Sequence, residues 1–196
     1  MKLFSAPLGA YETNCYLLWD GDDCAVIDPG EDGPALDDLL SRCPAAPRLV
    51  LLTHAHFDHV GGAEALRALG AAIWVHPAEA ALPKTLAPLD LAGTEALSDG
   101  LEIPFGTDVI RVLHTPGHTP GSCCFRIGTR LFTGDTLFRD SCGRTDLGGS
   151  AAEMTASLRR LHDLTGDCVV LPGHGGQSTL ARERENNYWM LQAVGP

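Results

Sequence analysis

Basic residues are scarce in this chain. Its 196 residues include 14 Lys and Arg against 25 Asp and Glu, which gives a formal net charge of −11. A nucleic-acid surface needs a stripe of Lys and Arg, and no such stripe occurs along the sequence, so we expect no nucleic-acid partner. No apolar run is long enough to cross a bilayer, and Met1–Ser5 lacks the apolar core of a secretion signal. We therefore expect a cytoplasmic protein that has no membrane contact.

Two common signatures of covalent catalysis are also missing. The sequence contains no Gly-x-Ser-x-Gly turn, and none of its seven cysteines stands next to a histidine. The cysteine count is odd and there is no Cys-x-x-Cys pair, which favours reduced thiols over a disulfide framework. Cys24 and Cys168 lie in apolar runs and are expected in the core, whereas Cys142 is expected near the functional site. A hydrolase built on this chain would need another source of nucleophile.

The composition is that of one compact globular unit. Of the residues, 44% are hydrophobic and 20% are charged, and the length suffices to bury a core without a second domain. We predict a single catalytic domain over residues 1–196. The sequence leaves the oligomeric state open.

The densest cluster of chemically useful side chains lies in Thr53–His59, directly after the apolar, strand-like run Leu49–Leu52. Six consecutive positions hold four potential metal ligands, namely His54, His56, Asp58 and His59. Imidazole nitrogens and carboxylate oxygens suit Zn, Fe and Mn, and the end of a strand is a rigid support for them. In a chain leaving a strand, positions i and i+2 point to one side. His54 and His56 can therefore share one ion, while Asp58 and His59 reach a second.

Three later residues stand in similar surroundings. Each follows a short apolar run and is preceded by glycine, which permits close approach of the backbone and tight turns. These residues are His118, Asp135 and His174. We predict that they complete the metal site.

In order and spacing these residues resemble the metallo-β-lactamase superfamily, whose pattern is a His-x-His-x-Asp-His loop followed by a single His, a single Asp and a final His. The resemblance implies two divalent metal ions, with zinc preferred and iron or manganese as alternatives. It assigns His54, His56 and His118 to the first metal, Asp58, His59 and His174 to the second, and Asp135 to a bridge between them.

Other segments resemble the short, single-domain branch of glyoxalase II-like (hydroxyacylglutathione hydrolase-like) enzymes. These segments are Thr13–Tyr16, Val26–Gly30, Thr115–Ser122 and Gly143–Asp146. Full-length glyoxalase II enzymes bind glutathione with a C-terminal helical extension. The sequence continues only 22 residues beyond His174, so we expect that extension to be missing or replaced.

Hydrophobic periodicity predicts a chain of mixed α and β elements. Strands are expected at Lys2–Leu8, Asn14–Trp19, Cys24–Ile27, Arg48–Leu52, Ala72–Val75, Val109–Leu113, Ser122–Ile127, Arg130–Phe132 and Cys168–Leu171. Helices are expected at Gly33–Arg42, Gly61–Leu69, Ala151–Leu161 and Leu180–Leu191. Ala80–Gly100 is expected to be a helical excursion or a flap over the site. The family resemblance implies the α/β fold in which these elements assemble, a four-layer αβ/βα sandwich of two mixed β-sheets flanked by helices.

The resemblance implies hydrolysis of a small-molecule thioester of the S-2-hydroxyacylglutathione type, such as S-lactoylglutathione, by a hydroxide held between the metals. Two metal ions lower the pKa of a shared water from about 15.7 toward neutrality and polarise the carbonyl that it attacks. We assign catalytic roles to Asp58 and Asp135. Asp58 would bind the second metal and orient the nucleophile or accept its proton.

Four further residues are expected to support the ligands. Asp28, His114 and Asp146 would do so by hydrogen bonds, and Arg144 would pair with Asp146 to brace the loop near the bridging aspartate. Arg144 is also a candidate for steering an anionic substrate, together with Arg126 and Arg139, although we interpret the last two as solvated surface charge.

Three alternatives stay open. Persulfide dioxygenases share the scaffold, hold one iron through two histidines and an aspartate, and carry a segment similar to Cys142–Asp146. A β-lactamase and a non-catalytic metal-binding protein are less favoured. A β-lactamase is less favoured because the loop residues with which lactamases bind the drug are not recognisable in this sequence. A non-catalytic protein is less favoured because all seven ligand positions are filled.

Overall fold

Two six-stranded sheets form the centre of the computed structural model, which describes residues 1–195. The first sheet has the order β1-β2-β3-β4-β5-β6 and the second the order β12-β11-β10-β9-β8-β7. The first comprises β1 (Lys2–Leu8), β2 (Thr13–Asp20), β3 (Asp23–Ile27), β4 (Leu49–Leu51), β5 (Ala72–Val75) and β6 (Glu95–Ala96). The second comprises β7 (Glu102–Phe105), β8 (Asp108–His114), β9 (Cys123–Ile127), β10 (Arg130–Gly134), β11 (Val169–Pro172) and β12 (Ser178–Thr179).

Both sheets are mixed. In the first, β1, β2 and β3 are antiparallel neighbours, and β3 to β6 run parallel. In the second, β10 and β11 are parallel and the other pairs antiparallel. The two mixed sheets predicted from the family resemblance are confirmed.

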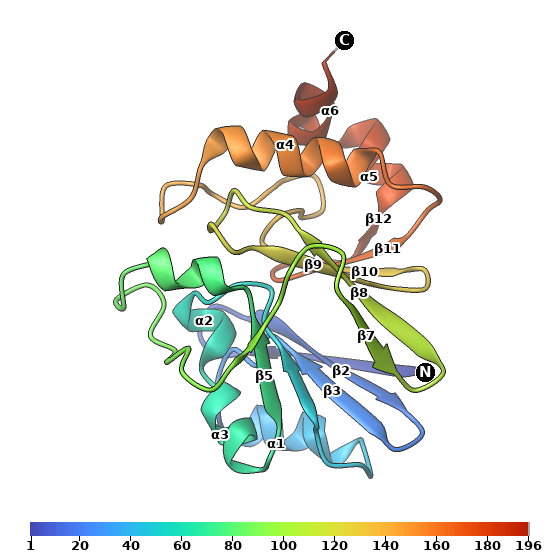
Figure 1. Ribbon diagram of the computed structural model, residues 1–196. Helices are drawn as coiled ribbons and strands as arrows, with labels where there is room; N and C mark the ends of the chain where they lie inside the picture. Colours follow the sequence, from blue (N-terminus) through green and yellow to red (C-terminus); the bar gives the residue numbers. More distant parts are fainter. Residues whose placement is uncertain (196) are drawn as a thin grey trace.

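Helices cover the outer faces of the two sheets (Figure 1). On the side of the first sheet lie α1 (Pro34–Ser41), α2 (Phe57–Val60), α3 (Ala63–Ala68) and the 3-10 turn η1 (Pro77–Ala81). On the side of the second lie α4 (Ala151–His162), α5 (Leu180–Asn186) and α6 (Tyr188–Val194). The Ser150 hydroxyl accepts a hydrogen bond from the Glu153 amide and so caps α4. The order helix, sheet, sheet, helix gives the four layers of the predicted sandwich.

Three apolar clusters hold these layers together, one between the sheets and one under each helical layer. Because side chains alternate along a strand, Leu17 of β2 packs under the first helical layer while Leu18 packs between the sheets. Phe105, Phe125 and Phe132 fill the space between the sheets and are almost fully buried. Burying one such side chain stabilises the fold by about 1.5–3 kcal/mol. The sheets therefore form a firm support for the loops at their edge.

One helix prediction is wrong. Leu180–Leu191 is not one helix, because Asn187 adopts an extended conformation between α5 and α6 and caps the second of them by accepting from the Met190 amide. For Ala80–Gly100, where a helical excursion or a flap was expected, the structure shows no helix beyond the end of η1; the segment runs as a loop to β6. Its Leu82, Ala87 and Leu89 are buried in the core, which holds this loop against the body of the protein.

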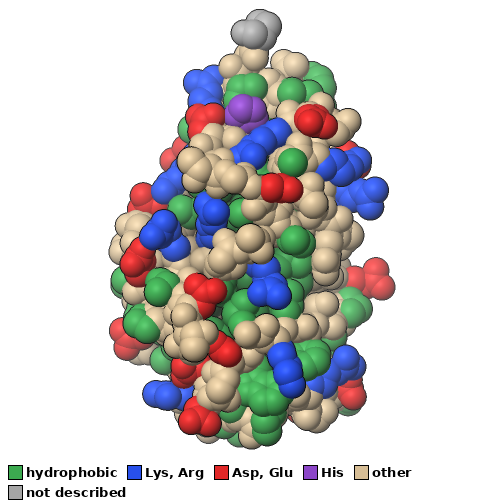
Figure 2. All heavy atoms as spheres, turned by 90° about the vertical axis from the view of Figure 1, so that its right-hand side faces the viewer, with side chains coloured by type: hydrophobic (Ala, Val, Ile, Leu, Met, Phe, Trp, Pro, Cys, Tyr) green, Lys and Arg blue, Asp and Glu red, His purple; other side chains and the backbone are tan. Residues whose placement is uncertain are grey.

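Charged side chains of both signs are interspersed on the face shown in Figure 2, where Lys and Arg do not gather into a stripe. Within residues 1–195, no helix combines the length and the apolar character needed to span a membrane.

Cys24 and Cys168 are buried, as expected, and all seven cysteines are free thiols.

Candidate metal centre

Four of the seven predicted ligands come from the first sheet. His54 and His56 follow β4, and the chain then turns into the short helix α2, which carries Asp58 and His59. His54, His56 and His59 are buried, each at most 4% exposed. The compact motif in the sequence thus becomes a strand end followed by one helical turn.

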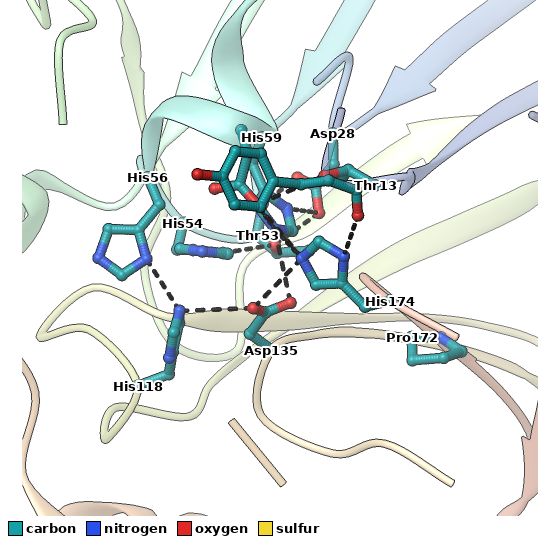
Figure 3. Close-up of polar contacts among 12 residues, drawn as sticks. Thr13, Asp28, Thr53, His54, His56, His59, His118, Asp135, Pro172 and His174 are labelled. Carbon is teal, nitrogen blue, oxygen red and sulfur yellow. Dashed lines mark hydrogen bonds and ion pairs between the residues drawn. The ribbon is translucent and has the colours of Figure 1, made fainter. Parts of the chain in front are cut away.

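The other three ligands come from the second sheet. His118 lies in the loop between β8 and β9, Asp135 directly follows β10, and His174 follows β11. Figure 3 shows these side chains facing the histidines of the first sheet across the edge of the sandwich. Gly173 is necessary for this approach, because a Cβ atom there would lie 2.7 Å from His59 Cε1 and would overlap Asp135 Oδ1.

Three overlapping groups of three potential ligands form at this edge. One of them, His54, His59 and Asp135, connects two others that share no residue, the first and the second group. In the first group, which is His54, His56 and His118, all ligand atoms lie within 4.8 Å of one another. In the second group, which is Asp58, His59 and His174, the same limit holds. These groups coincide with the two ligand sets that the family resemblance implies.

Asp135 stands between the two groups. Its Oδ2 lies 3.5 Å from His118 Nε2 in the first group and 3.6 Å from His174 Nε2 in the second. Its Oδ1 lies 3.4 Å from His59 Nε2. Figure 3 shows this carboxylate between His118 and His174, the position expected of a bridging ligand.

The five imidazoles are oriented by hydrogen bonds on their outer nitrogens. These nitrogens face Thr53 Oγ1 (from His54, 3.1 Å), Leu147 O (from His56, 3.2 Å), Asp28 Oδ2 (from His59, 3.0 Å), Arg144 O (from His118, 2.6 Å) and Tyr11 O (from His174, 3.1 Å). Carbonyl and carboxylate oxygens only accept, and the Thr53 hydroxyl donates to Asp28, so each outer nitrogen carries the hydrogen. In the neutral rings, the inner nitrogens present lone pairs.

Inner nitrogens of different ligands face one another. His56 Nδ1 lies 2.9 Å from His118 Nε2, and His59 Nε2 lies 3.3 Å from His174 Nε2. In addition, His54 Nε2 and Asp135 Oδ1 are buried without a hydrogen-bond partner. Buried polar atoms without partners are rare and need an explanation. Divalent cations would supply the missing partners, so the residues fit a pair of metal ions.

A sequence comparison identifies the family. Residues 8–174 match the model of the metallo-beta-lactamase superfamily, which covers most of the chain. The chain belongs to the metallo-β-lactamase superfamily. Members of this superfamily bind divalent metals, and this chain has a histidine-rich site at the edge described above.

Curated relatives in the superfamily include named hydrolases. The chain is 31% identical to the hydroxyacylglutathione hydrolase GloC of Haemophilus influenzae, over 95% of this chain and 97% of that protein. It is also 31% identical to the probable metallo-hydrolase YqgX of Bacillus subtilis, over 95% of this chain and 96% of that protein.

Solved structures confirm the fold. BLEG-1, described as a B3 metallo-beta-lactamase, is 32% identical with a TM-score of 0.85, covering 96% of this chain and 99% of that one. TTHA1623 in a di-iron-bound form is 38% identical with a TM-score of 0.81, covering 95% and 99%. ETHE1 from Myxococcus xanthus is 28% identical with a TM-score of 0.82, covering 96% and 84%. These superfamily neighbours confirm the α/β sandwich.

The two superfamily ligand groups differ in electrostatics. In the first, burial lowers the pKa of His54, His56 and His118, and repulsion from neighbouring imidazoles lowers it further. In the second, burial opposes protonation of His59, but the carboxylates of Asp135, Asp28 and Asp58 outweigh it and raise the pKa of His59 to about 9. The hydrogen bond to Asp58 likewise raises the pKa of His174. Without metal, the first group is therefore neutral at pH 7, whereas His59 is protonated.

This difference predicts how metal binding depends on pH. A metal ion that binds at the second group must displace the His59 proton, so about one proton is released at pH 7, with a further fraction from His174. A metal ion that binds at the first group releases almost none. Affinity at the second group should fall as the pH drops below about 9. Isothermal titration of the metal-free protein in buffers of different ionisation enthalpy measures this release. Two equal, proton-free binding steps at pH 7 would contradict the assignment.

Asp28 lies behind the second group. It is 1% exposed and accepts hydrogen bonds from His59 Nδ1 (3.0 Å), the Thr53 amide (2.8 Å) and the Thr53 hydroxyl (2.6 Å). Since the same hydroxyl faces His54, Asp28 links ligands of both groups. Asp28 has a positive φ of 50°, a conformation that Asp and Asn tolerate better than most residues.

Asp28→Asn is expected to weaken metal binding about 10- to 100-fold, the usual cost of losing a hydrogen bond on a ligating histidine. The amide keeps the shape and the left-handed backbone but turns one acceptor into a donor. A competition titration with a chromophoric chelator measures the affinity. Wild-type affinity in a folded variant would show that Asp28 only supports the fold.

The remaining predicted supports behave differently. The Arg144 side chain pairs with Asp146 through two contacts of 2.6 Å, as expected, but both side chains are exposed. The contact of Arg144 with a ligand is made by its backbone carbonyl, which accepts a hydrogen bond from His118 Nδ1. His114 does not support a ligand directly. Its ring Nε2 lies 3.0 Å from the Pro120 carbonyl and the ring stacks on His76 at 4.0 Å. Pro120 lies two residues after His118, so the His114 ring contacts the backbone of the loop that carries this ligand and not the ligand itself.

A cleft of about 340 Å³ opens over the ligands. Its apolar lining comes from Tyr11, Phe57, Leu86, Phe138 and Leu147. Leu86 belongs to the loop after η1 and accepts a hydrogen bond from the Phe57 amide with its carbonyl, so this loop does border the site. Among the described residues that line the cleft, Arg144 is the single Lys or Arg.

Several contributors were not predicted from the sequence. Tyr11 and Leu147 act through backbone carbonyls, which no side-chain pattern reveals. Thr53 carried a signal, because it is a polar residue between a buried strand and the first ligand, yet its hydroxyl partner on Asp28 lies 25 residues earlier.

Proposed function

We propose that the protein is a two-metal hydrolase that cleaves thioesters of the S-2-hydroxyacylglutathione type. The main support is the arrangement of Asp135, whose carboxylate reaches both groups of three ligands. The first metal would be held by His54, His56 and His118, and the second by Asp58, His59 and His174. Zinc suits this set of nitrogen and oxygen ligands, and iron or manganese are alternatives.

A bound pair of divalent ions supplies an acidified water and polarises a substrate carbonyl at neutral pH. Asp58 would orient that water. Burial opposes its ionisation, but the hydrogen bond from His174 and the charge of His59 outweigh burial and lower the pKa of Asp58 to about 2. Its carboxylate therefore stays ionised and acts as a hydrogen-bond acceptor across the physiological range.

The cleft suits a small molecule that has both apolar and anionic parts. Tyr11 and Phe57 pack edge to face at 5.2 Å on one wall, and Phe138 contacts His174 on the other. Arg144 supplies positive charge at the rim, although Asp146 partly neutralises it. The thioester assignment is supported by the likeness to the hydrolase GloC along nearly its whole length.

A persulfide dioxygenase with one iron is the second candidate, supported by the likeness to ETHE1. Completeness of the second ligand group favours the two-metal hydrolase. Asp58, His59 and His174 converge as closely as the first group does, and each of the two imidazoles is fixed by its own outer hydrogen bond.

Elemental analysis of the purified protein, beside an assay panel, tests the proposal. We expect two metal ions per chain and cleavage of S-lactoylglutathione, with little turnover of glutathione persulfide or nitrocefin. One iron per chain with persulfide-dependent oxygen uptake would replace the proposal with the dioxygenase. Dominant nitrocefin hydrolysis would instead favour a lactamase, as the BLEG-1 likeness suggests.

A further inference from the structure

Glu79 is a buried carboxylate behind the first ligand group. It belongs to the turn η1 after β5 and is only 1% exposed. Within residues 1–195 no Lys, Arg or His nitrogen forms an ion pair with it. A buried charge without a counter-ion is costly, so its retention requires compensating hydrogen bonds.

Those hydrogen bonds go to the two loops that carry the first ligand group. Glu79 Oε2 accepts from the Ala55 amide at 2.6 Å, and Oε1 accepts from the Gly121 amide at 2.7 Å. Ala55 lies between His54 and His56, and Gly121 lies three residues after His118. The loops follow strands of different sheets, so one carboxylate joins the two halves of the sandwich beside the ligands.

The site is shaped around this carboxylate. A Cβ atom on Gly121 would lie 2.6 Å from Glu79 Oε1 and 2.8 Å from its Cγ, closer than real contacts allow. A second link between the sheets, from the Cys123 amide to the Thr53 carbonyl at 2.7 Å, lies nearby. The sheets are therefore joined without Glu79, and the specific effect of Glu79 falls on the tips of the loops.

We propose that Glu79 is a positioning residue that sets the distance between the His54–His56 loop and the His118 loop, and thereby the affinity of the first metal site. This inference rests on the proposed two-metal centre. The side chain reaches no predicted ligand itself; it holds their backbone. Since outer hydrogen bonds on metal ligands typically contribute 10- to 100-fold to affinity, we expect an effect of this size from a carboxylate that anchors both loops.

The test uses a His174→Ala parent, in which the second group is incomplete and the first is intact. Zinc affinity is measured by competition with a chromophoric chelator, and Co(II) spectra report the ligand geometry. Glu79→Gln in this parent should weaken zinc binding about 10- to 100-fold and alter the Co(II) spectrum. The amide keeps the size of the side chain but places a donor against one of the two amide N–H groups.

Glu183→Gln is the matched control. Glu183 is a fully buried carboxylate in α5 that accepts from the Asp140 amide, Asn187 Nδ2 and the Ser178 hydroxyl, without contact to any predicted ligand. Unlike Glu79, it also pairs with Arg182. Both variants should lower the melting temperature, but only Glu79→Gln should change zinc affinity.

Gly121→Ala offers an independent route, because its methyl group displaces the Glu79 carboxylate while the glutamate remains, and it should weaken zinc binding in the same way.

The outcomes are distinguishable. A parent that binds no zinc contradicts the proposed metal centre itself. A parent that binds zinc, with Glu79→Gln and Gly121→Ala within twofold of it, overturns the positioning role and leaves the centre intact. If Glu79→Gln does not fold, Gly121→Ala decides the question alone. Equal losses in the Glu79 and Glu183 variants would also overturn the inference, since general destabilisation would then explain both.

Discussion

Replacing Asp135 by alanine is expected to abolish turnover and to release metal while the protein stays folded. We expect activity to fall at least about 10³-fold, because both metal sites lose a shared ligand. This exceeds the 10- to 100-fold loss that is typical when a ligand loses only its hydrogen bond to a neighbouring residue. Metal content, measured by elemental analysis after gel filtration, should drop below one ion per chain.

The fold should survive because His59, the protonated neighbour of Asp135 in the metal-free protein, keeps contacts with two other carboxylates, those of Asp28 and Asp58. Some loss of stability is expected, since a contact between a buried carboxylate and a protonated imidazole is removed. Asp163→Ala is a suitable control, since this carboxylate lies in the exposed cap after α4 and contacts only His162. Retained turnover or full metal content in Asp135→Ala would contradict the bridging role.

Stripping the metals with a chelator is expected to remove all activity and to lower the melting temperature strongly. A ligand present at about 1,000 times its dissociation constant stabilises the folded state by about 4.1 kcal/mol. For a chain of 150–250 residues, 1 kcal/mol corresponds to about 2–4 °C. The loss at one site should therefore lower the melting temperature by about 8–16 °C, as measured by calorimetry at fixed metal concentration.

Returning zinc should restore both activity and stability to the stripped wild type. The His174→Ala variant serves as its control, because it should recover the contribution of the first site alone. A stripped protein that keeps its melting temperature and its activity would show that the histidine-rich edge is not a metal site.

Local patterns in the sequence predicted the parts of the fold that depend on neighbours in the chain. Strands such as β1 and β3 show uninterrupted or alternating apolar runs, and their predicted bounds agree closely with those observed. Strand β7 was missed because only Ile103 and Phe105 are buried and Pro104 interrupts the run. The division between α5 and α6 was missed because it depends on Asn187, whose side chain donates to the distant carbonyls of Phe138 and Ser141.

The same distinction applies to the site. The ligand motif is local in Thr53–His59, and glycine-flanked strand ends mark the other three residues, so the sequence and the family resemblance together named the residues that the structure brings together at this edge. Glu79 has no such mark. It stands in an Ala-rich segment, and its relation to the ligands exists only because β5 places η1 beside loops from both sheets. His114 belongs to a recognisable motif, yet its ring contacts the Pro120 carbonyl in the His118 loop and stacks on His76, so it reaches no ligand side chain directly.

Anomalous diffraction from crystals of the zinc-loaded protein tests the central claim most directly. The account predicts two zinc peaks per chain at the edge of the sandwich, one contacted by His54, His56 and His118, the other by Asp58, His59 and His174, and both by Asp135. A single peak that leaves Asp58 and His174 without metal, or no peak among these seven side chains, would contradict it.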